Sequence, residues 1–146
     1  EKVLALKIFH KNRNKENFQQ LLNIIGEKEK ENFIKETFSI ISKENKFSAT
    51  DASFMIFVDF PDKAENYILE HKEELNGDYY TSLLPLAQSM EKSNHYLSAS
   101  VIYRALLDSI LRRAKSKYYP YGAKYLKKLD DLALQITDWK EITQHK

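Results

Sequence analysis

Apolar side chains recur along most of this chain at the three- and four-residue spacing of an amphipathic helix. The apolar positions between residues 15 and 25 are Phe18, Leu21, Leu22 and Ile25. This spacing places them on one face of a helix, and Gly26 stands where a glycine often follows a helix C-terminus. Asn14 can cap the other end, because its side-chain oxygen can accept from a free backbone N–H. The pattern predicts a helix over residues 15–25.

Further segments with the same spacing predict a series of consecutive helices. They cover residues 1–10, 28–43, 48–60, 61–75, 82–92, 95–116 and 120–136, and a last helix begins near 138. Ser48 and Asp51 have the spacing of a capping box, in which two side chains satisfy backbone N–H groups at a helix start. Residues 54–60 taken alone also fit a strand. Pro61 favours the helix, because proline is well tolerated as the first residue of a following helix.

Two prolines set helix boundaries. Pro61 disfavours α geometry at Phe60, so one helix ends there and the next begins. Pro85 lies inside an apolar, periodic segment, where a proline removes a backbone donor. We expect Thr81 or Ser82 to cap that helix, because Pro85 then falls in the first turn, where a missing N–H does little harm.

The fold class follows from these predictions. Three glycines and three prolines leave few of the turn residues that a sheet protein needs, so helices dominate. Helices of ordinary length with short links favour antiparallel hairpins stacked side by side. We therefore expect an all-α fold, an α–α superhelix of the tetratricopeptide or HEAT kind.

One hairpin can be compared with the tetratricopeptide pattern of large and small residues on two packed helices. The matching positions are Leu83, Leu86, Ala87, Met90, Tyr96, Ala99, Tyr103 and Leu106. The small residues Ala87 and Ala99 matter because the two helices approach closely there. Leu83 replaces the usual Trp and Asn94 the usual turn Gly. The hairpin is therefore repeat-like and not a strict tetratricopeptide copy.

Length and composition limit the class of protein further. The 146 residues fit one domain, 1–146, with a Phe-rich part (1–77) and a Tyr-rich, basic part (78–146). Without cysteine, the chain has no disulfide and no thiolate metal site. No apolar run approaches the roughly 20 residues of a membrane helix, and the N-terminus lacks signal-peptide features. We expect a soluble, cytoplasmic protein without a membrane partner. Because the sequence starts at Glu1 without a methionine, we also expect it to be a fragment of a longer chain.

The charge is nearly balanced overall but unevenly distributed along the sequence. The net charge is +2, and residues 104–140 hold nine Lys or Arg against four Asp. Arg104, Arg112 and Arg113 are three of the four arginines in this Lys-rich chain. A guanidinium group holds a carboxylate or phosphate by two bonds, so this concentration favours recognition of an acidic partner.

A candidate partner-binding site lies on the predicted helix 95–116 and just after it. Its residues are Arg104, Asp108, Arg112, Lys115, Tyr118, Tyr119 and Lys124. Ser100, Arg104 and Asp108 begin a polar line, because residues that recur every three or four positions share a helix face. The structural alternative is that Arg104 pairs with Asp108 or with a neighbouring helix.

Residues 115–128 also interleave tyrosines with lysines, a pattern typical of nucleic-acid surfaces, where rings stack on bases and ammonium groups neutralise phosphates. However, Tyr121 and Tyr125 lie one turn apart and Leu129 continues their line, which favours a core-facing stripe with a solvated basic face. A net charge of +2 is also far below the basic balance of typical nucleic-acid binders. Nucleic acid is therefore the weaker candidate partner.

Three short runs resemble a known family. They are Tyr103–Leu107 (YRALL), residues 110–119 (ILRRAKSKYY) and residues 122–126 (GAKYL). Together they resemble the C-terminal helical region of a bacterial family catalogued as a domain of unknown function, some of whose relatives look similar to proteins with a SWIM-type zinc finger. The resemblance covers about residues 83–142 and implies a helical-repeat fold without an assigned activity. The SWIM cysteines and the expected basic C-terminal extension are absent, so no zinc site carries over and the chain resembles a fragment.

Catalytic motifs are missing from the sequence. The four histidines, at positions 10, 71, 95 and 145, share no metal-ligand spacing, and there is no HExxH, GxSxG or glycine-rich phosphate loop. We therefore expect no catalytic residue, no metal and no cofactor. The predicted function is a non-enzymatic helical-repeat module that binds a protein or peptide. The alternatives are a nucleic-acid-binding domain that uses residues 115–128 and a regulatory domain.

Overall fold

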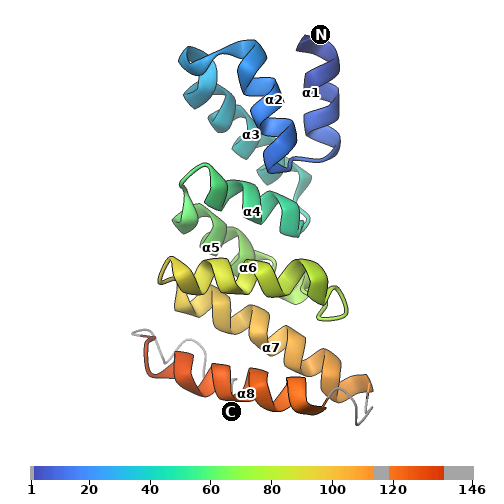
Figure 1. The fold of residues 1–146 in the computed structure, drawn as a ribbon, viewed down its shortest axis with the longest axis vertical. Helices are drawn as coiled ribbons and strands as arrows, with labels where there is room; N and C mark the ends of the chain where they lie inside the picture. Colours follow the sequence, from blue (N-terminus) through green and yellow to red (C-terminus); the bar gives the residue numbers. More distant parts are fainter. Residues whose placement is uncertain (1, 114–118, 137–146) are drawn as a thin grey trace. The chain divides into compact units, whose positions relative to one another are not determined.

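The computed structural model describes residues 2–113 and 119–136. All regular secondary structure in these residues is helical, so the predicted all-α fold class is confirmed. In chain order the elements are α1 (Lys2–Lys11), α2 (Lys15–Ile25), η1 (Glu27–Glu29), α3 (Lys30–Glu44), α4 (Ala49–Phe57), α5 (Pro61–Glu70), η2 (Lys72–Glu74), α6 (Tyr80–Lys92), α7 (Tyr96–Arg113) and α8 (Tyr119–Ala133) (Figure 1). Contacts group them into two compact units, residues 1–60 and 61–146.

Local hydrogen bonds fix two of the predicted helix starts in the first unit. The Asn14 side chain accepts from the backbone N–H of Asn17 at 2.8 Å, so Asn14 is the N-cap of α2. Ser48 accepts from the backbone N–H of Asp51 at 3.3 Å and caps α4 in the same way. Both predicted caps are confirmed. Gly26 follows α2 with a positive φ of 87°, a conformation that residues with a Cβ rarely adopt.

A cluster of phenylalanines forms the core of the first unit. Phe9 of α1 is fully buried, and its ring centroid lies 6.0 Å from Phe18, 5.3 Å from Phe33 and 5.5 Å from Phe54. Each of these rings comes from a different helix, and each such pair adds about 0.5–1.5 kcal/mol beyond area burial. The Phe-rich composition of this part of the chain therefore reflects a shared aromatic core.

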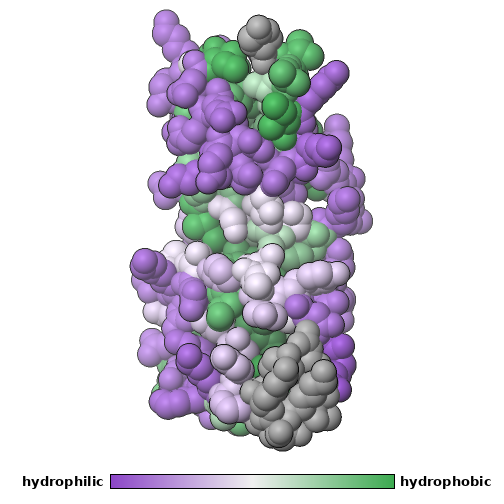
Figure 2. Space-filling model, turned by 45° about the vertical axis from the view of Figure 1, so that its right-hand side comes forward, coloured by the Kyte–Doolittle hydropathy of each residue, from purple (hydrophilic) through white to green (hydrophobic). Residues whose placement is uncertain are grey.

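The outer face of α1 is apolar and exposed. Val3 is 65% exposed, Leu4 62% and Ile8 42%. Figure 2 shows hydrophobic surface beside the start of the chain. Phe9 is the one buried residue of α1, and the helix packs mainly against α2.

Arg13, between α1 and α2, is a buried cation. Its side chain is 5% exposed, with Nη2 2.8 Å from Glu44 Oε2 and Nη1 3.0 Å from Asp51 Oδ2. The hydrogen bond to Arg13 lowers the pKa of Glu44, whereas burial raises the pKa of Asp51 and Arg13 opposes that rise. One guanidinium group therefore joins the end of α3 to the start of α4.

In the second unit, α7 lies between α6 and α8 (Figure 1). The residues that the hairpin pattern places inward are Leu83, Leu86, Ala87, Met90, Ala99, Tyr103 and Leu106, and all are buried. Tyr96 differs from them, because it is only partly buried and its hydroxyl donates to the side chain of Asn94 at 2.8 Å. The predicted inward face of this hairpin is thus confirmed except at its aromatic start.

The predicted close contact between α6 and α7 can be tested at Ala99. Its side chain is fully buried. We expect Ala99→Leu to lower the free energy of unfolding by about 1–3 kcal/mol, because extra methyl groups overpack a filled core. Ala123→Leu, at an exposed position of α8, is the matched control and should change it by less than about 0.5 kcal/mol. Urea denaturation of the two variants measures the difference, and equal midpoints would show that the helices are not in close contact at Ala99.

Two predicted details of the second unit are wrong. Neither Thr81 nor Ser82 caps α6: the helix begins at Tyr80 after the N-cap residue Tyr79, which makes no side-chain cap bond, and Pro85 lies inside it. Its first four N–H groups need no intrahelical partner, but Pro85 is the sixth residue, so it leaves one carbonyl near the exposed start of the helix without its donor. The predicted helix 61–75 also stops at Glu70 and continues as the short turn η2.

The predicted exposed polar line on α7 does not include Ser100, so this prediction is also wrong. Its side chain is fully buried, and its hydroxyl donates to the Leu97 carbonyl at 2.7 Å. A serine can satisfy its own hydroxyl on the preceding turn, so polarity alone does not place it at the surface.

Within the described residues, no helix is long and apolar enough to cross a membrane.

Candidate functional site

A cavity of about 410 Å³ lies over α7, between α6 and α8. It forms because α6 and α8 both pack along α7 and make few contacts with each other. We call it the α6–α8 trench. The described residues that line it are Gly77, Tyr80, Leu84, Gln88, Glu91, Tyr103, Leu106, Ser109, Ile110, Tyr121, Lys124, Tyr125 and Lys128.

The α6 wall of the trench is one face of a single helix. Tyr80, Leu84, Gln88 and Glu91 follow one another at helical spacing, so their side chains project from the same side. Tyr80 is 52% exposed, and Gln88 is also exposed. The wall therefore presents an aromatic ring at one end and a carboxylate at the other.

The floor of the trench is apolar and the opposite wall carries rings and lysines. Leu106 and Ile110 of α7 are buried beneath it. On α8, Tyr125 is buried, and its ring centroid lies 6.0 Å from that of Tyr103. Tyr121, one turn earlier, is 54% exposed. The trench is thus apolar inside and has polar tyrosine and lysine groups near its rim.

The Glu91 carboxylate, paired with the Lys128 ammonium group, lies at one end of the trench. Glu91 accepts from the Tyr103 hydroxyl at 3.1 Å and from Lys128 Nζ at 3.0 Å. Burial, together with the adjacent Glu91 carboxylate, raises the pKa of Tyr103 far above its ordinary value. Tyr103 therefore stays a neutral donor at physiological pH. The Nζ atom of Lys128 also lies 5.9 Å from the centroid of the Tyr103 ring, which adds a cation–π contact.

Lys124 is the other cation of the trench. Its side chain is exposed, and among the described residues no carboxylate lies within ion-pair distance of it. By contrast, its neighbour Lys127 lies outside the trench lining and pairs with Asp131 at 3.8 Å. Lys124 is therefore the trench cation with the most freedom to bind a partner.

The structure separates the residues of the candidate site predicted from sequence. Arg104 Nε pairs with Asp108 Oδ1 at 3.3 Å, the structural alternative considered for these two, and Arg112 lies 4.0 Å from Asp78. Of the described candidates only Lys124 lines the trench. Lys115, Tyr118 and the Tyr119 side chain lie outside the described residues.

Sequence reasoning missed the α6 wall and the Glu91–Lys128 pair. The available signal was the outward face of α6, where Tyr80, Leu84 and Gln88 recur every four residues. In the described part of the alternative nucleic-acid surface at 115–128, Tyr125 packs into the core and Lys127 and Lys128 are paired, whereas Tyr121 and Lys124 are exposed.

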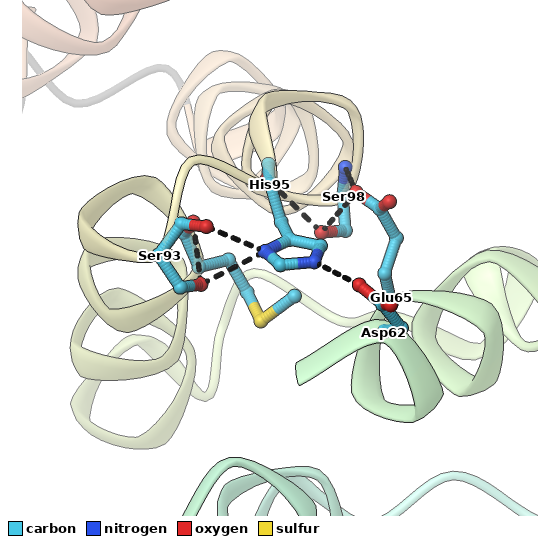
Figure 3. A network of polar contacts seen from close by, with 6 residues as sticks. Asp62, Glu65, Ser93, His95 and Ser98 are labelled. Carbon is cyan, nitrogen blue, oxygen red and sulfur yellow. Dashed lines mark hydrogen bonds and ion pairs between the residues drawn. The ribbon is translucent and has the colours of Figure 1, made fainter. Parts of the chain in front are cut away.

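A second polar cluster lies at the turn between α6 and α7. Figure 3 shows His95 between Ser93 and Asp62, with Glu65 beside Ser98. His95 Nε2 lies 2.6 Å from Asp62 Oδ1. Nδ1 lies 3.0 Å from the Ser93 hydroxyl oxygen and 2.8 Å from the Ser93 carbonyl oxygen.

This cluster has the residue types of a hydrolytic triad but not its chemistry. A carbonyl oxygen only accepts, so the Nδ1 contact with the Ser93 carbonyl requires a proton on Nδ1, which then cannot act as a base for the hydroxyl. The Ser93 hydroxyl lies 3.1 Å from the Met90 carbonyl and can donate to it instead. The Asp62 side chain is 93% exposed, unlike the buried acid that orients a catalytic histidine.

The cluster instead joins α5 to the start of α7. Glu65 accepts from the backbone N–H of Ser98 at 3.2 Å and from its hydroxyl at 3.0 Å. A carboxylate at a helix N-terminus satisfies a free N–H and is favoured by the helix dipole. Within the part of the chain that the structure describes, no group of three His, Cys, Asp or Glu side chains could hold a metal ion.

The described residues thus form an all-α protein with a surface cavity over α7, between α6 and α8. A family model described as a family of unknown function, DUF6880, matches residues 5–146, and the chain belongs to this family. The predicted membership of a family of unknown function is thereby confirmed. No curated protein and no solved structure gives a significant match.

Proposed function

We propose that this protein is a non-enzymatic interaction module that binds a peptide segment of a partner protein in the α6–α8 trench. The observation that carries the proposal is the cavity of about 410 Å³, with tyrosines on its walls and an apolar floor. Its volume falls within the roughly 300–1,000 Å³ of ligand sites. Tyrosine suits such a surface, because its ring contributes apolar area and its hydroxyl remains a hydrogen-bonding group.

The dimensions of the trench favour a segment over a single side chain. The α6 wall runs from Tyr80 to Glu91, and at about 1.5 Å per residue it extends for about 16 Å. That length corresponds to about three turns of a bound helix. In helix-in-groove recognition, apolar side chains on one face of the partner helix pack into a groove. Here they would pack against Leu84, Leu106 and Ile110.

Blocking the trench tests the proposal. Random 16-residue peptides displayed on phage are selected against the full chain, and the enriched peptides are then titrated against Gln88→Trp. The bulky indole should fill the trench and weaken binding by about tenfold or more. Gln20→Trp, at an exposed glutamine of α2, is the matched control and should bind like the wild type. If no enriched peptide distinguishes these two variants, the trench is not a peptide site.

The alternative, nucleic-acid binding through residues 115–128, is tested by a salt titration with single-stranded RNA and DNA. Phosphate contacts are strongest at low ionic strength, so affinity should fall steeply as salt rises. Binding of this kind that is equal in wild type and Gln88→Trp would favour the alternative. No binding at low salt would remove it.

A further inference from the structure

We infer that the segment bound in the α6–α8 trench is acidic, with an Asp or Glu close to an apolar anchor residue, and that Lys124 and Lys128 recognise its carboxylate. This inference rests on the proposed function and specifies the partner of the same site.

The trench carries a surplus of positive charge. Its only charged lining residues, among those that the structure describes, are Glu91, Lys124 and Lys128. Glu91 is satisfied internally, because the Tyr103 hydroxyl and Lys128 each donate to one of its oxygens. A cation from a partner could therefore pair with Glu91 only by displacing Lys128 from it. An anion meets no such competition.

The two lysines are placed to share one carboxylate. Lys124 and Lys128 are four residues apart on α8, so they lie on the same face with their Cβ atoms about 5–6 Å apart. An ammonium group has three donors, and the described contacts of Lys128 include one hydrogen bond, to Glu91. Lys124 has no carboxylate partner among the described residues. A partner carboxylate between them would gain two charge-assisted hydrogen bonds.

The apolar floor sets where the anchor of the partner lies. Leu84 of α6 and Ile110 of α7 line the trench, with Tyr121 at its α8 rim. A Leu, Phe or Trp side chain of the partner in this cavity removes apolar surface from water. The acidic residue next to it then lies at the rim, near the two lysines. The acidic residue should therefore lie within about one helical turn of the anchor.

Charge reversal tests the inference with the display-selected peptides. The enriched sequences should carry Asp or Glu within four residues of Leu, Phe or Trp, and Lys124→Glu should weaken their binding by about tenfold or more. The matched control is Lys127→Glu, the same change on the same helix at a residue outside the trench lining, which should change affinity by less than about twofold. A synthetic peptide whose acidic residue is replaced by Lys should bind Lys124→Glu better than wild type.

The outcomes separate the two proposals. Peptides that lose binding to Gln88→Trp but show no acidic preference, or that bind Lys124→Glu and Lys127→Glu equally, would overturn the acidic partner and leave the trench as a docking site. Peptides that bind Gln88→Trp and Gln20→Trp equally would overturn both. Circular dichroism of each variant confirms that the comparison is made between folded proteins.

Discussion

Replacing Arg13 with alanine is expected to lower the free energy of unfolding of the first unit by about 3–5 kcal/mol. The Arg13 side chain is 5% exposed and that of Asp51 7%, so the substitution leaves a buried carboxylate without its cation. The cost of desolvating that charge, and not the loss of an attraction, dominates the effect. Glu44 also loses its partner, but its side chain is 38% exposed and can be hydrated.

Two further variants identify the cause of this loss. Arg104→Ala removes the same side chain from an exposed pair with Asp108 and should change stability by less than about 1 kcal/mol. Adding Asp51→Asn to Arg13→Ala removes the stranded charge and should restore part of the stability. Urea denaturation followed by circular dichroism measures all three. A loss of similar size for Arg104→Ala would contradict the role assigned to burial.

The second large effect is expected at Gly77, where alanine should destabilise the second unit by about 3 kcal/mol. A Cβ on Gly77 would lie 2.2 Å from the Ala105 carbonyl oxygen and 2.7 Å from Ser109 Cβ. The closest atom belongs to the α7 backbone, which cannot rotate away as a flexible side chain can. The loop before α6 must lift from α7, and the hydrogen bond from Ser109 to Asp78 is then lost.

Gly122→Ala is the matched control for this prediction. A Cβ there would meet the Ile110 methyl group Cγ2 at 3.3 Å, which a small side-chain movement can relieve. Alanine also favours the α8 helix over glycine by about 1 kcal/mol. The net change should therefore stay within about 1 kcal/mol. Thermal denaturation compares the two variants, and similar melting temperatures would show that the Gly77 loop is not held against α7.

The candidate site could be predicted only in part. Lys124 was identified because it belongs to a basic, tyrosine-rich segment, and it does line the trench. Arg104 was identified by the same reasoning, but its pair with Asp108 lies within one helix and leads to no cavity. Tyr80 and Lys128 are far apart in sequence, and nothing in their local pattern shows that they line one trench. The buried role of Arg13 was missed for the same reason, because its partners follow 31 and 38 residues later.

The sequence by itself determined where most helices run and which faces they bury. Asn14, Ser48 and Gly26 end or begin helices through bonds and backbone angles that involve only near neighbours, so they can be read directly. Tertiary structure alone decided that α6 and α8 pack on α7 rather than on each other, and this leaves the trench. Such a choice depends on packing between distant segments, where many arrangements bury the same apolar faces and only the summed contacts select one.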